Sequence, residues 1–152
     1  MTMTVQTLGD REEIRELRHR FGAALDTRDW PAFEALFTPD ATGDFRSFGV
    51  PSAATALPEL VQMFRRSFAR PADELATQQV VSNFLIEIHG NSATSSSYLE
   101  GHHRIAGHSD GEEVTLRARY DDELVRTAHG WRISRTTLHV ISVSGNAAIL
   151  AG

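Results

Sequence analysis

Two adjacent histidines in the segment YLEGHHRIAG are the side chains best suited to exchange a proton near neutral pH, because imidazole titrates at a pKa of about 6.5. The segment is predicted to be a β-strand, in which successive side chains point to opposite faces. His102 and His103 therefore face opposite sides, and only one can reach the interior. His102 shares a face with Tyr98, and we favour His102 as a catalytic residue. The alternative is that both histidines are partly exposed.

Tyr120 and Asp122 form a second candidate pair, in the segment ARYDDELV. They are two positions apart on a predicted strand and share a face with Leu116 and Leu124. A tyrosine hydroxyl beside a carboxylate in an apolar pocket can donate to a substrate oxygen and stabilise developing negative charge. We therefore predict a catalytic role for Tyr120 and a binding role for Asp122, with a purely structural hydrogen-bond role as the alternative. Arg119 belongs to the opposite face.

Asp26 is a carboxylate without an obvious local role. Asp29, three positions later, is well placed to cap the next helix, and Pro31 fits the first turn of that helix. Asp26 is thus left either to face a pocket or to make a structural contact with an arginine or a turn. We predict that it is catalytic.

Helices occupy the first half of the sequence. Apolar residues recur at three- and four-residue spacing over residues 11–26, with Asp10 as the expected N-cap and Glu13 at the capping-box position. A short helix follows Asp29, and a third helix is predicted over residues 53–69. Between the second and third helices, residues 41–52 are expected to form a short strand and a loop.

Four strands are predicted in the second half, where the apolar period changes from 3.6 to about 2. Glycine-containing polar segments separate them, as hairpin loops require, and give an antiparallel meander over residues 78–88, 93–106, 114–127 and 131–143. His139 in the last strand shares a face with Trp131 and Ile133 and is expected to point inward. The fold class is α+β, with helices covering one face of the sheet.

The bulk composition excludes several classes of function. The net charge of −5 and the absence of a basic cluster argue against nucleic acid as a partner. No apolar run or leader-like N-terminus suggests a membrane or export, and the absence of cysteine fits a cytoplasmic protein. Adjacent strand histidines diverge, and no phosphate- or dinucleotide-binding motif is present, so we expect neither metal nor cofactor.

Several motifs together resemble the SnoaL-like group of the nuclear transport factor 2-like superfamily. They are an Asp-x-x-Asp-Trp segment at Asp26, followed in order by FEALFTPDA, VVSN and ARYDDELVRTAHGWRISR, and the resemblance extends from about Glu12 to Val143. It implies one domain over residues 1–152, with a core of about 12–143. The implied fold is a cone-shaped, strongly curved antiparallel sheet with three N-terminal helices, a cystatin-like α+β barrel. That fold hosts dehydratases, isomerases, cyclases and non-catalytic proteins.

The resemblance also implies a dyad that this sequence lacks. In related dehydratases an aspartate at the position of Asp26 pairs with a histidine four residues before a strand asparagine. Counting back from Asn83 gives Gln79, and glutamine cannot take up a proton at useful pH. Scytalone dehydratase, which the fold resembles, has a second histidine on the next strand, where this chain has His102 and His103.

We therefore predict a cofactor-independent dehydratase, isomerase or cyclase that acts on an apolar, oxygenated ring metabolite, such as a polyketide or steroid-like compound. Asp26 or His102 would move the proton, and Tyr120 and Asn83 would hold the oxygen that gains charge. The residues expected to bind the substrate are Trp30, Phe64, Gln79, Asn83, Tyr98, Asp122 and His139.

Two other functions are compatible with the sequence. One is a non-catalytic ligand-binding or assembly domain, in which Gln79 marks lost chemistry. The other is an epoxide hydrolase, which would use Asp122, Arg119 and Asp26 to position water. A homodimer or homotrimer is expected in every case, with Leu138, Val140 and Ser142 contributing to an apolar outer sheet face.

Overall fold

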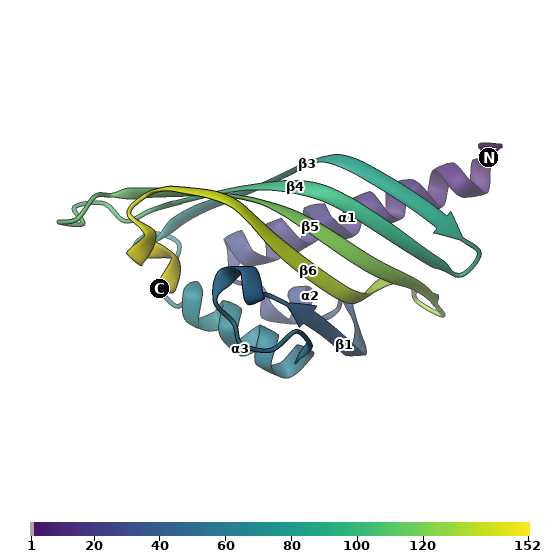
Figure 1. The fold of residues 1–152 in the computed structure, drawn as a ribbon, viewed down its shortest axis with the longest axis horizontal. Helices are drawn as coiled ribbons and strands as arrows, with labels where there is room; N and C mark the ends of the chain where they lie inside the picture. Colours follow the sequence, from purple (N-terminus) through teal and green to yellow (C-terminus); the bar gives the residue numbers. More distant parts are fainter. Residues whose placement is uncertain (1) are drawn as a thin grey trace.

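The computed structural model describes residues 2–152 as an α+β fold, in which helices cover one face of a curved six-stranded sheet (Figure 1). The strand order is β2-β1-β6-β5-β4-β3, with β2 and β3 at the edges. Among these residues no helix is long and apolar enough to cross a membrane. The elements are α1 (Val5–Thr27), α2 (Trp30–Glu34), β1 (Phe37–Asp44), η1 (Arg46–Phe48), β2 (Thr55–Ala56), α3 (Leu57–Ser67), β3 (Ala76–His89), β4 (Ser92–Arg104), β5 (Glu113–Thr127), β6 (Gly130–Gly145) and η2 (Ala147–Ala151).

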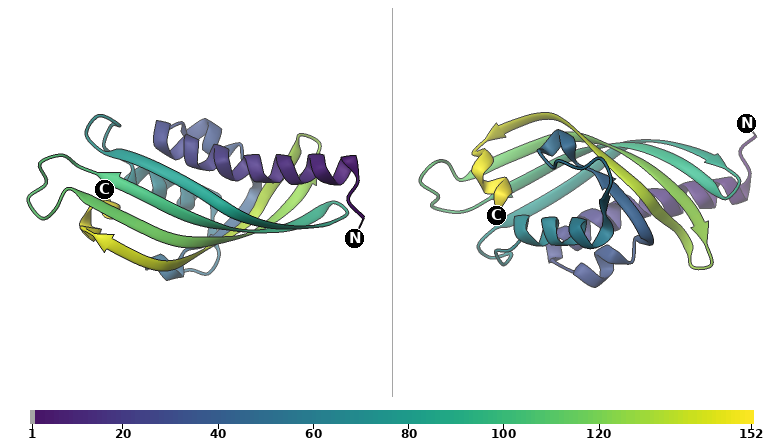
Figure 2. Two further views of the ribbon diagram at one scale, coloured as in Figure 1. Left: turned by 90° about the horizontal axis from the view of Figure 1, so that it is seen from above. Right: turned by 60° about the horizontal axis from the view of Figure 1, so that its bottom comes forward.

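The predicted meander is confirmed, because β3, β4, β5 and β6 pair in sequence as antiparallel neighbours. The sheet as a whole is mixed rather than antiparallel, since β1 runs parallel to β6. Figures 1 and 2 show α1 lying along the concave side of the sheet, with α2 and α3 on the same side and the C-terminal turn η2 following the end of β6. The helices therefore cover the concave face of the curved sheet.

The start of α1 differs from the prediction. The helix begins at Val5, where the Thr4 hydroxyl accepts a hydrogen bond from the Thr7 amide. Asp10, the expected N-cap, lies inside the helix and is buried; its carboxylate accepts hydrogen bonds from the Arg126 guanidinium and from Trp131 Nε1 at 3.0 Å. The capping prediction was wrong because Asp10 binds residues more than a hundred positions away in the sequence.

The other two helices are close to their predicted positions. The Asp29 carboxylate caps α2 by accepting a hydrogen bond from the Ala32 amide at 3.1 Å. Helix α3 begins at Leu57, with Pro58 in its first turn, where the missing amide hydrogen is harmless. Its start is four residues later than predicted, because Thr55 and Ala56 pair with β1 as the short strand β2.

A β-bulge in β6 reverses the predicted orientation of the residues that follow it, as far as a second register shift at Ile141. Ile133 pairs with Leu124 and Arg135 with Glu123, so Ser134 is an extra residue and the alternation shifts by one. Leu138 is consequently buried on the inner face, and His139 lies outside, 2.9 Å from the Asp121 carboxylate. The expectations of an inward His139 and an outward Leu138 were both wrong for this reason.

Candidate functional site

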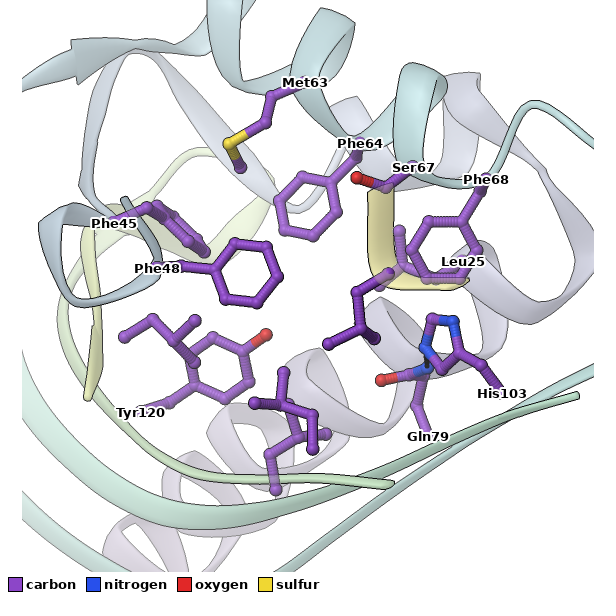
Figure 3. A pocket seen from close by; sticks show the side chains of 14 residues that line it. Leu25, Phe45, Phe48, Met63, Phe64, Ser67, Phe68, Gln79, His103 and Tyr120 are labelled. Carbon is purple, nitrogen blue, oxygen red and sulfur yellow. Dashed lines mark hydrogen bonds between the residues drawn. The ribbon is translucent and has the colours of Figure 1, made fainter. Parts of the chain in front are cut away.

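An apolar cavity lies between the inner face of the sheet, the C-terminal part of α1, α3 and the turns η1 and η2 (Figure 3). Its volume is about 60 Å³, measured as the space in which the centre of a water molecule can lie. Four lining residues carry a polar group that can form hydrogen bonds: Ser67, Gln79, His103 and Tyr120. The remainder of the wall is Leu25, Phe45, Phe48, Met63, Phe64, Phe68, Leu99, Leu116, Leu138 and Leu150.

His103, not His102, reaches this cavity. His103 is 4% exposed, and its ring packs against Phe68 with 5.2 Å between ring centroids. Burial, together with the smaller effects of the positive charges of Arg28 and His102, lowers the pKa of His103 to about 4. The imidazole is therefore neutral at physiological pH.

His102 is the opposite case, and its predicted placement was wrong. Its side chain is 41% exposed on the outer face of β4, where Nδ1 lies 3.2 Å from the Thr115 hydroxyl. The strand alternates as expected, but its inward residues are odd-numbered, including Leu99 and Gly101. Tyr98 shares the outer face with His102 and is 49% exposed.

Gln79 holds the His103 ring. Its Nε2 lies 3.2 Å from His103 Nε2. Gly101 is directly opposite Gln79 in the β3–β4 register, and a methyl group there would lie 3.0 Å from Gln79 Oε1. Gly22 of α1 approaches from the other side, since a methyl group there would lie 3.0 Å from Gln79 Cβ. Two glycines thus leave the space in which the glutamine side chain reaches His103.

Asp26 lies behind the cavity wall rather than in it. Its Oδ1 accepts a hydrogen bond from the Thr77 hydroxyl at 2.8 Å, and its Oδ2 accepts one from the Gln79 backbone amide at 3.1 Å. Burial raises the pKa of this carboxyl, and these two hydrogen bonds together with the charge of Arg28 partly oppose that effect. Asp26 therefore fixes the segment of β3 that carries Gln79.

Arg28 also holds the start of β3 in place, and its own backbone has an unusual conformation. It occupies the left-handed region with φ 57° at the end of α1. Its guanidinium donates to the Thr77 hydroxyl at 3.0 Å, to the Asp26 carbonyl at 2.9 Å and to the Leu75 carbonyl at 2.7 Å. It also lies 5.2 Å from the centre of the Phe68 ring. The end of α1, the start of β3 and the cavity wall are thereby joined.

Tyr120 lines the opposite part of the cavity. Burial raises the pKa of Tyr120 to about 12, the charge of Arg18 opposes that increase, and Asp122 adds to it. The Arg18 guanidinium lies 3.6 Å from the centre of the Tyr120 ring and donates to Asp122 at 2.6 and 2.7 Å. Arg18 and Asp122 are each about 1% exposed, so they form a buried ion pair that supports the ring from behind.

The structure brings only some of the predicted residues together. Tyr120, Phe64 and Gln79 line the cavity. Five predicted binding residues lie elsewhere: Trp30 packs on Phe33, Asn83 is exposed beside a bulge in β3, Asp122 pairs with Arg18, and Tyr98 and His139 are on the outer face.

Most of the cavity wall was not predicted from the sequence, including His103, Ser67, Leu138 and Leu150. The alternation in β4 offered a usable signal for His103, because Ala93 and Leu99 are on its face and are apolar. The tail residue Leu150 reaches the wall through η2, whose cap Asn146 accepts a hydrogen bond from the Ala148 amide. Among residues 2–152, no group of three or more His, Asp or Glu side chains is arranged to hold a metal ion.

A profile of the SnoaL-like domain family matches residues 6–137. The chain is a member of the SnoaL-like domain family. This membership confirms the resemblance seen in the sequence, and the curved sheet with helices on its concave side agrees with the fold that it implied.

Several relatives cover nearly all of this SnoaL-like chain. The protein Rv2910c of Mycobacterium tuberculosis is 29% identical over 135 residues, which are 88% of this chain and 86% of the relative. The crystal structure of Kfla4162 from Kribbella flavida is 26% identical with a TM-score of 0.82, covering 95% of this chain and 98% of that chain. A candidate scytalone dehydratase from Novosphingobium aromaticivorans is 19% identical with a TM-score of 0.79, covering 95% and 92%. The last similarity establishes the fold alone.

Proposed function

We propose that this SnoaL-like protein is a cofactor-independent enzyme that moves a proton on a compact, apolar, oxygen-bearing molecule, as dehydratases and isomerases do. The observation that carries the proposal is a neutral, buried imidazole, that of His103, held by Gln79 across an apolar cavity from the Tyr120 hydroxyl. An enzyme name among structures of the same fold, the candidate scytalone dehydratase, is consistent with this class of chemistry.

The chemistry follows from the two sides of the cavity. His103 would accept a proton from a carbon beside a carbonyl group, because its neutral form is the populated one above a pKa of about 4. Tyr120 would donate a hydrogen bond to the oxygen that gains negative charge, because its own raised pKa keeps the hydroxyl protonated. Asp26 acts through the Gln79 backbone and is a positioning residue.

The lowered pKa of His103 affects its action as a base in two opposite ways. A weaker base removes a proton less readily, but it stays unprotonated far into the acid range. The proposal therefore gives a specific pH profile. The rate should be constant around neutral pH and fall as the pH drops through about 4.

The second candidate function is ligand binding without catalysis, and Gln79 favours it. The related enzymes place a histidine where this chain has an amide, and Asp26 makes its two side-chain hydrogen bonds to Thr77 and Gln79 rather than to a histidine. The epoxide hydrolase hypothesis requires Arg119 and Asp122 to meet at one site. They do not, because Arg119 pairs with Asp121 on the outer face of the sheet and Asp122 pairs with Arg18 on the inner face.

Solvent deuterium exchange tests the proposal without knowledge of the natural substrate. Acetophenone and cyclohexanone carry exchangeable hydrogens beside a carbonyl group, and NMR in D₂O follows their loss. The protein should accelerate exchange, His103→Asn should remove the acceleration, and the matched control His102→Asn should leave it intact. If bound probe exchanges no faster than free probe, or if both histidine variants behave alike, proton transfer by His103 is excluded and the binding function remains.

The expected homodimer or homotrimer stays a prediction. Exposed apolar side chains on the sheet support it, at Val80, Tyr98, Ile141 and Val143. Analytical ultracentrifugation of the wild type and of Ile141→Lys would test it: a self-associating wild type should become monomeric in the variant. A monomeric wild type would contradict the prediction.

A further inference from the structure

We infer that the cavity selects an uncharged, single-ring molecule that carries one oxygen at each end. This inference rests on the proposed function, because it concerns the ligand of the same cavity. It concerns recognition rather than proton transfer, so a binding experiment can test it separately.

The polar groups of the wall are gathered at two separate places. Gln79 and His103 lie together on one side of the cavity, and Tyr120 lies on the other, with apolar side chains between them (Figure 3). The only hydrogen bond drawn among these lining side chains joins Gln79 to His103, which leaves the Tyr120 hydroxyl free toward the cavity. His103 Nδ1 is buried and has no partner within the described residues, so the polar atom on this side that points into the cavity in Figure 3 is the side-chain oxygen of Gln79. A ligand with an oxygen at each end would reach both places.

No ionised side chain faces a ligand from this wall. Its fourteen residues include no Asp, Glu, Lys or Arg. The nearby charged groups make their contacts behind the wall, since Asp26 accepts hydrogen bonds from β3, Arg28 donates to backbone carbonyls and Arg18 forms an ion pair with Asp122. A charged ligand would therefore lose its hydration without gaining an opposite charge, which is a large unfavourable term in an apolar site.

The size of the cavity limits the ligand to a compact molecule. A single water molecule needs roughly 10–15 Å³ of such volume, and the cavity offers about 60 Å³. An engineered apolar cavity of about 150 Å³ binds benzene, so one ring with small substituents enters this smaller space only if the wall shifts outward slightly, and larger molecules are excluded first. A fused multi-ring skeleton, as in a steroid, would require Phe48 of η1 or Leu150 of η2 to move away.

Three para-substituted benzene compounds of nearly equal size test separately the need for two oxygens and the need for a neutral ligand. 4-Hydroxyacetophenone is neutral with an oxygen at each end, 4-ethylphenol has one oxygen, and 4-hydroxybenzoate carries a negative charge at neutral pH. Calorimetry with the wild-type protein should give the tightest binding for 4-hydroxyacetophenone. Loss of one hydrogen bond should weaken 4-ethylphenol by roughly threefold to tenfold. The charge should weaken 4-hydroxybenzoate by about 100-fold or more.

A tyrosine pair supplies the matched control. Tyr120→Phe should abolish the preference for 4-hydroxyacetophenone over 4-ethylphenol, whereas Tyr98→Phe, on the outer face, should retain it. Equal binding of 4-hydroxybenzoate and 4-hydroxyacetophenone, or no binding of any probe, would overturn the inference. Selective binding without deuterium exchange would support it and contradict the proposed enzyme instead.

Discussion

Lowering the pH should destabilise this protein through one residue, His103. The folded state keeps this imidazole neutral down to a pKa of about 4, whereas in the unfolded chain it takes up a proton below about 6.5. The unfolded state therefore binds more protons between these two values. The free energy of unfolding should fall as the pH is lowered from 6.5 to 4 and level off below that range.

The magnitude follows from the displaced pKa. A change of one in pKa is worth about 1.4 kcal/mol, so lowering the pKa of His103 to about 4 corresponds to roughly 3 kcal/mol of stability at neutral pH. Two carboxyl groups with shifted pKa values also change the stability of the protein with pH. Asp10 has a pKa of about 2, so its own loss of stability comes below pH 4. Asp26 has a raised pKa and acts in the opposite sense, gaining stability as the pH falls through its folded value.

Urea unfolding at a series of pH values, followed by circular dichroism, measures this dependence. Wild-type protein should lose about 3 kcal/mol more than His103→Asn between neutral pH and pH 4, because the variant lacks the titrating group. His102→Asn, which removes the exposed neighbour, should follow the wild type. Parallel curves for the wild type and His103→Asn would refute the reasoning, since they would mean that His103 titrates alike in both states.

Three further outcomes are expected. Arg18→Met should cost about 3–5 kcal/mol in urea unfolding because it leaves Asp122 buried and unpaired, and the double variant Arg18→Met, Asp122→Leu should recover most of that loss; additive losses would contradict this. Asp26→Asn should cost about 1–3 kcal/mol in the same assay by weakening its hydrogen bonds to Thr77 and Gln79, so an unchanged midpoint would deny Asp26 its structural role. Leu150→Ala should admit 2-naphthol, which the native cavity should reject, and equal calorimetric binding by both proteins would contradict the assigned wall.

The site residues show where prediction from the sequence ended. Tyr120 was placed correctly because regular alternation in β5 separates it from Arg119, and because Leu116 and Leu124 mark the buried face. The choice between His102 and His103 failed on the same kind of pattern. Tyr98 is aromatic yet lies outside, so it marked the wrong face of β4.

The bulge in β6 shows a second limit. One extra residue at Ser134 exchanges the faces of the residues that follow it, as far as a second register shift at Ile141, and this moved Leu138 into the cavity and His139 out of it. No glycine marks the position. The bulge is defined by pairing with β5, so it is a property of two strands together rather than of either segment.

Local patterns in the sequence determined the helices, the hairpins, the antiparallel meander and the family, because periodicity, caps and turn residues act over a few positions. Tertiary structure alone decided the chemistry of the site. The buried Asp10 accepts hydrogen bonds from Arg126 and Trp131, and Asp26 accepts one from the backbone of β3. His103 is neutral because it is buried. These roles depend on contacts between residues far apart in the chain, and such contacts exist only once the sheet has curved around the helices.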